Sequence, residues 1–310
     1  MMKNISIIVP VYNEELSINS LYNQIKNVVE TSFENYEIIF IDDGSSDKSY
    51  SIIKDLVKLD NNVITIQMSR NYGKSDALNE GIKIVKYDFV ATLDADLQDD
   101  PNELVNLISK LDEGWDCVSG WKKDRHDPIS KTIPSFFFNK TVNILSGLNL
   151  HDLNCGIKVY KKNAIKSLSL YGGLHRFIPL LLINNGYKVT EEIVKHRPRK
   201  YGNTKYGNSR FFHGVFDFLT IFFLKKYFNR PMYFFGTIGF FLFSIGFIIN
   251  LYLSFQWFSG VYIGNRPLFF LGILLILIGA QSLSIGLIGE LIVNNSIQKN
   301  NKVKKIIDNK

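Results

Sequence analysis

The chain has 310 residues and a formal net charge of +7, and 46% of its residues are hydrophobic. This length allows one large domain and an appendage. The basic residues flank an apolar C-terminal part, which favours an anionic membrane surface over nucleic acid as the partner. The two cysteines, Cys117 and Cys155, lack a metal-type spacing, which argues against a cysteine metal site and favours reduced thiols in the cytoplasm.

Up to about residue 200, short apolar runs alternate with charged segments of helical periodicity. We expect strands over residues 5–11, 37–41, 63–68, 89–93 and 114–120, and a helix after each of the first four. Strands that alternate with helices imply right-handed crossovers and a largely parallel sheet, so the expected fold class is α/β. Asn13 is the expected N-cap of the first helix. A further strand is expected after residues 151–158, at an edge of the sheet.

Polar side chains follow each of the first four expected strands. They are Tyr12 and Glu14, then Asp42, then Arg70, and finally Asp94 and Asp96. In an open parallel sheet the ligand binds beyond the carboxyl ends of the strands. An aromatic ring can stack on a base, and a carboxylate such as Glu14 or Asp42 can accept hydrogen bonds from ribose hydroxyls or a base N–H. The pattern predicts a nucleotide pocket, and the alternative is a set of ordinary loop-capping side chains.

Asp94 and Asp96 stand one residue apart at the end of the fourth strand. If the chain is still extended there, both carboxylates point to one side and can bind one hard cation. Like charges this close are unfavourable without a counter-ion. The alternative is that Asp96, Asp99 and Asp100 only cap the helix that Pro101 opens, although a cap needs one carboxylate and the segment supplies four.

Two common phosphate-binding motifs are missing from the sequence. There is no G-x-G-x-x-G after the first strand and no G-x-x-x-x-G-K-[ST]. The phosphates of a nucleotide must therefore be held in another way. Because divalent ions commonly bridge carboxylates and substrate phosphates, we expect Mg²⁺ or Mn²⁺ on Asp94 and Asp96.

Four segments in order carry a resemblance to a known family. They read Val-Pro-Val-Tyr-Asn-Glu-Glu at 9–15, Asp-Asp-Gly-Ser-Ser-Asp at 42–47, Asn-Tyr-Gly-Lys-Ser-Asp-Ala-Leu-Asn at 71–79 and Asp-Ala-Asp-Leu-Gln-Asp-Asp-Pro at 94–101. They resemble the inverting glycosyltransferases of family 2, and most closely the branch of dolichyl-phosphate mannose synthase and bacterial polyprenyl-phosphate glycosyltransferases. The resemblance covers nearly the whole chain and implies a GT-A fold.

The resemblance also implies roles for the residues at the strand ends. The residues expected to bind the nucleotide are Pro10, Tyr12, Glu14, Asp42, Arg70, Lys74 and Asp94. The residues expected around the metal and the diphosphate are Asp94, Asp96 and Gln98, and Asp96 is also expected to be catalytic.

A second set of residues is expected to face the acceptor phosphate: Lys122, Lys131 and Arg176. Similar enzymes usually have Arg where Lys122 stands, and Lys keeps the charge without the bidentate fork. The alternative for residues 122–125 is a solvated basic loop. Asp152 lies in a motif that borders the acceptor site in similar enzymes and is a candidate catalytic base. A lipid monophosphate is already largely ionised near neutrality, with a second pKa of about 6. We therefore predict that no carboxylate other than the metal ligands is indispensable.

Residues 196–207 interleave cations with glycines, a composition that suits a loop closing over a diphosphate. The resemblance places Arg199 and Lys205 in this loop as catalytic residues. The alternative is a juxtamembrane patch that binds anionic lipid.

The C-terminal part is expected to attach the chain to a membrane. Residues 208–230 have aromatic side chains near helical spacing and predict a helix in the interface plane. Residues 234–253 and 268–288 lack charge, and each is about long enough to cross a hydrocarbon core of roughly 30 Å. The alternative is two buried helices of a soluble domain. Gln281 lies in the second span, where we expect it to pair helices or to contact a second subunit of a homo-oligomer.

Basic residues before and after the two spans set the expected topology. Lys225, Lys226 and Arg230 precede the pair and five lysines follow Gln298, whereas the link between the spans holds only Arg266. The positive-inside rule then places the catalytic domain and both termini in the cytoplasm, at the inner or plasma membrane. The expected parts are a catalytic domain (1–207), a juxtamembrane helix (208–230), a transmembrane hairpin (231–293) and a basic tail (294–310).

These observations predict an inverting, metal-dependent glycosyltransferase of the cell envelope. It would move a sugar from a nucleotide sugar, with UDP favoured, to a polyprenyl phosphate such as undecaprenyl phosphate. One alternative is a processive polysaccharide synthase, but none of Trp115, Trp121 and Trp257 stands in the expected Gln-x-x-Arg-Trp motif. The other is an inactive membrane adaptor, against which the intact acidic and basic site residues argue.

Overall fold

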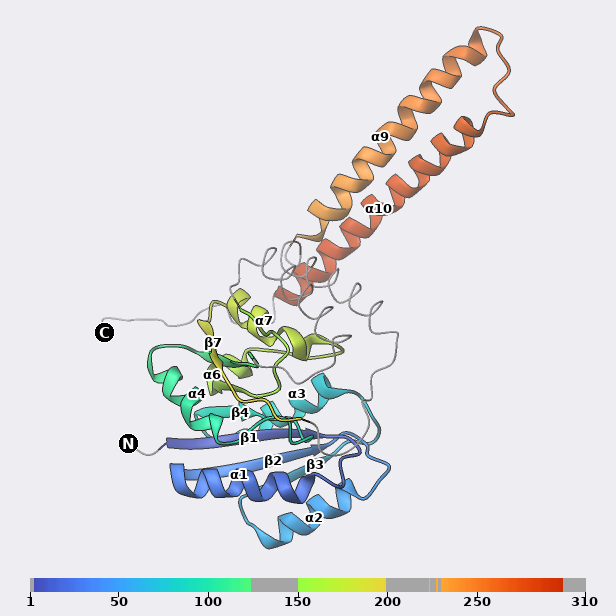
Figure 1. Cartoon of the computed structure of the whole chain (residues 1–310). Helices are drawn as coiled ribbons and strands as arrows, with labels where there is room; N and C mark the ends of the chain where they lie inside the picture. Colours follow the sequence, from blue (N-terminus) through green and yellow to red (C-terminus); the bar gives the residue numbers. More distant parts are fainter. Residues whose placement is uncertain (1–2, 124–149, 199–222, 224–226, 228–229, 298–310) are drawn as a thin grey trace. The chain divides into compact units, whose positions relative to one another are not determined.

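The computed structural model describes residues 3–123, 150–198, 223, 227 and 230–297 (Figure 1). The chain divides into two compact units, Met1–Phe218 and Leu219–Lys310. The first unit holds a seven-stranded sheet, and the second holds two long apolar helices. The predicted interfacial helix at 208–230 and the basic tail lie largely outside the described residues.

The first unit alternates strands and helices in the predicted manner. Its elements are β1 (Lys3–Val11), α1 (Ile18–Ser32), β2 (Phe33–Asp42), α2 (Ser49–Leu59), β3 (Val63–Gln67), α3 (Lys74–Ile84), β4 (Phe89–Thr92), α4 (Glu103–Asp112), β5 (Cys117–Trp121), β6 (Lys158–Lys161), α6 (Lys162–Lys166), the 3₁₀ helix η1 (Leu174–Phe177), α7 (Ile178–Asn184) and β7 (Val189–Ile193). The fold class is α/β, as predicted.

The strands lie in the order β3-β2-β1-β4-β6-β5-β7. β1 pairs in parallel with β2 and β4, and β2 pairs in parallel with β3, so the carboxyl ends of these four strands share one rim. β6 runs antiparallel to both of its neighbours, β4 and β5. The prediction of an edge strand after residue 158 is therefore wrong. Lys158, Val159 and Tyr160 are all buried, because β6 sits inside the sheet.

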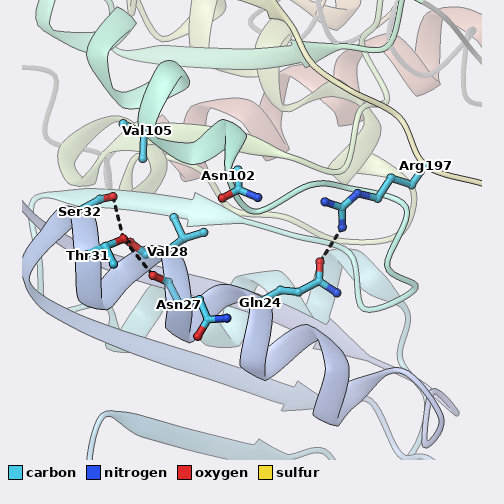
Figure 2. Close-up of a pocket in the computed structure, with 8 residues that line it drawn as sticks. All are labelled: Gln24, Asn27, Val28, Thr31, Ser32, Asn102, Val105 and Arg197. Atoms are coloured by element: carbon cyan, nitrogen blue, oxygen red, sulfur yellow. Dashed lines mark hydrogen bonds between the residues drawn. The ribbon is translucent and has the colours of Figure 1, made fainter.

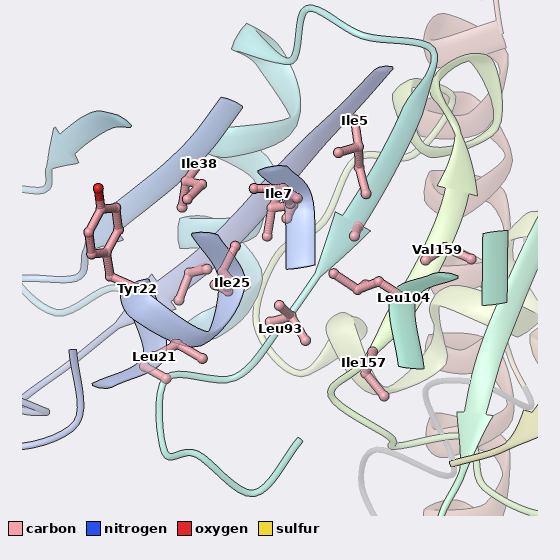
Figure 3. Close-up of a cluster of buried hydrophobic side chains, with 14 of the residues drawn as sticks. Ile5, Ile7, Leu21, Tyr22, Ile25, Ile38, Leu93, Leu104, Ile157 and Val159 are labelled. Atoms are coloured by element: carbon pink, nitrogen blue, oxygen red, sulfur yellow. The ribbon is translucent and has the colours of Figure 1, made fainter. Parts of the chain in front are cut away.

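Both faces of the sheet are covered, which explains the continuous apolar sequence of β1. Ile5 and Ile7 belong to a buried cluster that includes Leu21 of α1 (Figure 3). Ile8 faces the other way, towards α3, because a Cβ atom on Gly81 would lie 2.7 Å from Ile8 Cγ2. Successive residues of β1 thus pack against helices on opposite faces of the sheet.

The first helix begins later than predicted, at Ile18 instead of directly after Asn13. Asn13 has a positive φ of 51°, and its side-chain oxygen accepts a hydrogen bond from the Ser46 backbone N–H at 2.7 Å. Leu16, which lies between Asn13 and the start of this helix, is 64% exposed. The segment between β1 and α1 is therefore a loop at the rim, fastened to the loop after β2.

The second unit contains α9 (Pro231–Phe258) and α10 (Pro267–Ile297), which enclose the two predicted spans. Both helices are long and apolar enough to cross a membrane. Only 11% of the most apolar window of each is buried, whereas the core helix of a soluble domain is mostly buried. The helices approach closely through glycines, since a Cβ atom on Gly239 would lie 2.7 Å from the Gly279 carbonyl oxygen and one on Gly246 would lie 2.6 Å from that of Gly272.

Candidate active site

The loops after β1 and β2 are joined by backbone-to-side-chain hydrogen bonds. The Asn13 N–H donates to Ser45 Oγ at 3.0 Å, and the Glu14 N–H donates to Ser49 Oγ at 2.8 Å. The serines belong to the segment that opens α2, so the two loops form one surface. This surface carries the predicted nucleotide residues Tyr12 and Glu14, both partly exposed, beside Pro10 at the end of β1.

Asp42, the last residue of β2, is completely buried. Its Oδ1 accepts a hydrogen bond from the Ser45 N–H at 3.3 Å. Its Oδ2 is buried and has no hydrogen-bond partner in the described part of the chain. A buried, unpartnered carboxylate oxygen is costly, so this atom suits a donor from a ligand, such as a ribose hydroxyl or a base N–H.

The loop between β3 and α3 is held against the loop after β2. Asp43 accepts hydrogen bonds from the backbone N–H groups of Tyr72 and Gly73, at 2.8 and 2.9 Å. Gly44 has a φ of +67°, and a Cβ atom there would lie 2.4 Å from the Arg70 carbonyl carbon, so only glycine fits. The Arg70 guanidinium lies over the Tyr72 ring, 4.7 Å from its centroid. Arg70 is thereby placed at the same rim as Asp42.

Lys74 opens α3 and its ammonium forms an ion pair with Asp94 Oδ1. Burial would raise the pKa of Asp94, but the positive charges of Lys74, Lys122 and Lys158 outweigh it and lower the pKa to about 2. The side chain of Asp94 is therefore deprotonated near neutral pH, and it already pairs with a positively charged side chain. The structure brings Lys74 and Asp94, both predicted nucleotide residues, into contact.

β4 ends at Thr92, so Asp94 and Asp96 lie beyond the strand, and Ala95 and Asp96 form a turn. The premise that an extended strand aligns the two carboxylates is wrong. Leu97 has a positive φ of 63° and is only 4% exposed. This conformation is unfavourable for leucine, so burial of the side chain holds the turn in place. Asp96 Oδ1 accepts a hydrogen bond from the Gln98 N–H at 3.2 Å.

The predicted metal ligands fit an ion that is shared with a substrate. No group of three or more His, Cys, Asp or Glu side chains is arranged to hold a metal ion within the residues the structure describes. Asp94, Asp96 and Gln98 can each supply an oxygen ligand, and a magnesium ion commonly takes one or two carboxylates and completes its shell with phosphates and water. Asp94 is suited to this role because its carboxylate already pairs with the positively charged side chain of Lys74.

The residues predicted for the acceptor are only partly brought together. Lys122 pairs with Asp99, with 2.8 Å between Lys122 Nζ and Asp99 Oδ1, and both side chains are largely buried. Asp152 is buried, and its Oδ1 accepts a hydrogen bond from the Asn154 N–H at 3.2 Å. Arg176 lies in η1. The predicted residues Lys131, Arg199 and Lys205 lie outside the described residues.

Sequence reasoning missed an arginine that braces the loop of acidic residues. Arg197 donates to Gln24 Oε1 at 2.6 Å (Figure 2). It also donates to Asp100 Oδ2 at 2.5 Å. It borders a pocket of about 360 Å³ lined by Gln24, Asn27, Val28, Thr31, Ser32, Asn102, Val105 and Arg197. Arg197 stands in the basic run at 196–207, but no local pattern identifies partners so remote along the chain.

His175 is also part of the surroundings of Lys74. Its Nδ1 lies 2.9 Å from Ser75 Oγ, and its backbone N–H donates to the same oxygen at 3.0 Å. Burial and the neighbouring charges of Lys74 and Arg176 hold the pKa of His175 well below its ordinary value. This histidine is a neutral structural residue that fixes η1 to the start of α3.

This sheet, with polar residues at the carboxyl ends of its parallel strands, has the architecture of an α/β protein of the GT-A type. The family model described as glycosyl transferase family 2 matches residues 6–169. The chain belongs to this family, which confirms the resemblance inferred from the four motifs.

Similar proteins align with both units of the chain. The dodecaprenyl-phosphate galacturonate synthase of Rhizobium johnstonii is 33% identical over 294 residues, covering 93% of this chain and 87% of that protein. The undecaprenyl-phosphate 4-deoxy-4-formamido-L-arabinose transferase of Shewanella sediminis is 35% identical over 299 residues, covering 93% and 86%.

A solved structure supports the fold. The glucosyl-3-phosphoglycerate synthase of Mycobacterium tuberculosis, in complex with Mn²⁺, UDP-glucose and phosphoglyceric acid, has a TM-score of 0.56 and is 19% identical. The match covers 71% of this chain and 80% of that one. At this identity the likeness shows a common GT-A-type architecture and no more.

Proposed function

We propose that the chain transfers a sugar from a nucleotide sugar, with UDP as the favoured nucleotide, to a polyprenyl phosphate. The observation that carries this proposal is the pair of acidic groups on the strands that flank β1. Asp42 ends β2, and its Oδ2 has no hydrogen-bond partner among the described residues. Asp94 follows β4 and pairs with the ammonium group of Lys74. These are the two groups that recognition of a nucleoside and of a diphosphate with its metal requires.

The lipid acceptor is supported by the relatives. Both are named as polyprenyl-phosphate enzymes, and each aligns with 93% of this chain, including the two apolar helices. A soluble acceptor would leave these helices without a role in the reaction. A lipid acceptor accounts for both units of the chain.

The donor is bound at the rim in this proposal. Tyr12 stacks on the base, while Glu14 and Asp42 accept hydrogen bonds from the nucleoside. Arg70 and Lys74 supply positive charge to the diphosphate. Arg199 and Lys205, outside the described residues, close over it from the basic loop.

Asp94, Asp96 and Gln98 would hold Mg²⁺ or Mn²⁺, which would offset the negative charge that builds on the departing nucleoside diphosphate. Asp94 stays deprotonated throughout the physiological range, since its pKa is about 2. The loop of these residues is braced by Arg197 and by buried Leu97, so the ligands need little rearrangement.

The transfer is a direct displacement at the anomeric carbon. An oxygen of the lipid phosphate forms a bond to this carbon, and the bond to the donor diphosphate breaks, with the electron pair leaving on the nucleoside diphosphate. A single displacement of this kind inverts the anomeric configuration. The phosphate is largely ionised near neutrality, with a second pKa of about 6, so Asp152 is not needed as a base. Positioning of the two substrates supplies the main part of the acceleration.

The proposed location is the inner or plasma membrane, with the catalytic unit and both termini in the cytoplasm. The basic residues on either side of the two spans support this orientation, because the link between the spans carries a single arginine. Arg176 and Lys131 then serve the acceptor phosphate at the cytoplasmic surface.

Incubation of the full-length protein with undecaprenyl phosphate and a panel of labelled nucleotide sugars tests the proposal. We expect one donor to yield label that partitions into the organic phase, and an Asp96→Asn variant to insert into membranes normally but give none. A reaction without lipid controls for hydrolysis. Label that stays aqueous with every donor would exclude a lipid acceptor, and full activity of Asp96→Asn would exclude the metal.

A further inference from the structure

Lys122, directly after β5, carries a buried ammonium group that pairs with the carboxylate of Asp99. Its Nζ lies 2.8 Å from Asp99 Oδ1, and the two side chains are 13% and 1% exposed. Burial would lower the pKa of Lys122, but the negative charge of Asp99 outweighs it and raises the pKa above its ordinary value. The contact between the two side chains is therefore shielded from solvent.

Asp99 lies close to Asp94. A Cβ atom on Gly156 would be 2.5 Å from Asp94 Oδ2 and 2.5 Å from Asp99 Oδ2, so the two oxygens lie within twice that distance of each other. Asp99 Oδ2 is buried and makes no hydrogen bond to any residue that the structure describes. Two carboxylates at this separation repel each other unless a cation acts on both.

Three lysines, Lys74, Lys122 and Lys158, place positive charge near these carboxylates. Lys74 contacts Asp94 Oδ1, on another atom of that carboxylate. Lys158 is buried and donates to the Cys155 carbonyl oxygen, and burial lowers its pKa. Lys122 contacts Asp99, and its charge also stabilises the deprotonated form of Asp94.

We infer that Lys122 is a positioning residue that acts through Asp99: its ammonium neutralises this buried carboxylate, so that a divalent ion binds Asp94 together with Asp96 and not between Asp94 and Asp99. This inference rests on the proposed function for the role of the ion. It departs from the sequence-based prediction that Lys122 contacts the acceptor phosphate. Without the ammonium, Asp94 and Asp99 form a second acidic site that competes for the ion.

The test compares Lys122→Met with the double variant Lys122→Met/Asp99→Asn in the full-length protein. Mn²⁺ affinity is measured without nucleotide, from the electron paramagnetic resonance signal of free Mn²⁺. Loss of one positive charge from a buried acidic pair should tighten Mn²⁺ binding by roughly tenfold in Lys122→Met. The double variant, which removes the charge of Asp99 as well, should return to within about threefold of the wild-type value. Lys123→Met is the matched control, because this neighbouring lysine is exposed, and it should bind Mn²⁺ as the wild type does.

Steady-state kinetics then distinguish a positioning role of Lys122 from binding of the acceptor phosphate. We expect kcat to fall in Lys122→Met and to recover in the double variant, with the KM for undecaprenyl phosphate within about threefold of wild type in both. A KM raised tenfold or more in both variants would assign Lys122 to the acceptor and overturn the inference. Mn²⁺ binding that is unchanged or weaker in Lys122→Met would also overturn it.

Two further outcomes remain informative. If Lys122→Met does not fold, folding of the double variant supports the pair, because a buried carboxylate without its partner is the cause. Failure of both variants to fold would overturn the inference. If no nucleotide sugar supports turnover, the proposed function fails, whereas the Mn²⁺ measurements still decide whether Lys122 acts through Asp99.

Discussion

Arg197 and Asp100 form an ion pair, with 2.5 Å between Arg197 Nη2 and Asp100 Oδ2, that joins the segment after β7 to the loop of acidic residues. The backbone strengthens this link, since the Arg197 N–H donates to the Gln98 carbonyl oxygen at 3.0 Å. The other end of the guanidinium reaches Gln24 of α1. Three segments remote in sequence are thus held together beside the predicted metal ligands.

An Arg197→Lys variant should show how much this brace contributes. Lysine keeps the charge but lacks the planar fork that reaches Gln24 and Asp100 at the same time. We expect a loss of about 1–2 kcal/mol in the free energy of unfolding, a modest value because Arg197 is partly exposed. Chemical denaturation of the full-length protein in detergent measures it. Lys166→Ala, at an exposed site, is the control, and equal stability of Arg197→Lys and wild type would contradict the prediction.

Asp42→Asn is expected to weaken nucleotide binding without destabilising the fold. Asparagine can still accept the hydrogen bond from the Ser45 N–H, but the charge on the unpartnered oxygen is lost. A hydrogen bond to a charged group contributes about 1.5–3 kcal/mol, so UDP should bind roughly 10- to 150-fold more weakly. Isothermal titration calorimetry with UDP and Mn²⁺ measures this. The exposed Asp55→Asn serves as control, and unchanged UDP affinity in Asp42→Asn would remove Asp42 from the nucleotide site.

The ion pair of Lys74 with Asp94 should make stability depend on pH in the acid range. The pKa of Asp94 is lowered from 3.8 to about 2 in the folded chain. A lowered folded-state pKa means that the pair stabilises the fold fully above the unfolded value of 3.8, and that this contribution disappears as the pH falls towards 2. The wild type should therefore lose more stability than Asp94→Asn between pH 4 and pH 2, as followed by circular dichroism in metal-free buffer. Parallel acid unfolding of both proteins would show that the pair contributes nothing.

The two cysteines should be unreactive in the folded protein. Cys117 and Cys155 are free and buried, as expected for reduced thiols, and burial raises the pKa of each to about 12. Because the thiolate is the reactive form, N-ethylmaleimide should label neither residue until the chain is unfolded by denaturant. Mass spectrometry of labelled peptides measures this. Rapid labelling of Cys155 under native conditions would contradict the prediction and show that the segment before β6 opens to solvent.

Local sequence was sufficient for the repeating strands and helices, for the two apolar helices and for the position of the polar residues at the rim. Hydrophobic periodicity reports burial along one segment, and for this it needs no knowledge of neighbours. The motifs around Asp42 and Asp94 lie at the ends of β2 and β4, as predicted, and the roles of their residues stay predictions. The start of α1 was missed, because Asn13 bonds to Ser46 of the next loop instead of capping its own helix.

The three-dimensional fold alone decided how remote segments meet. It placed β6 inside the sheet, paired Lys122 with Asp99, and set Arg197 between Gln24 and Asp100. It also ended β4 at Thr92 and turned the chain at Leu97, so that Asp94 and Asp96 lie beyond the strand. These contacts depend on the crossover of strands and on charges that are stabilised only when buried together, and neither property is encoded in the periodicity of a single segment.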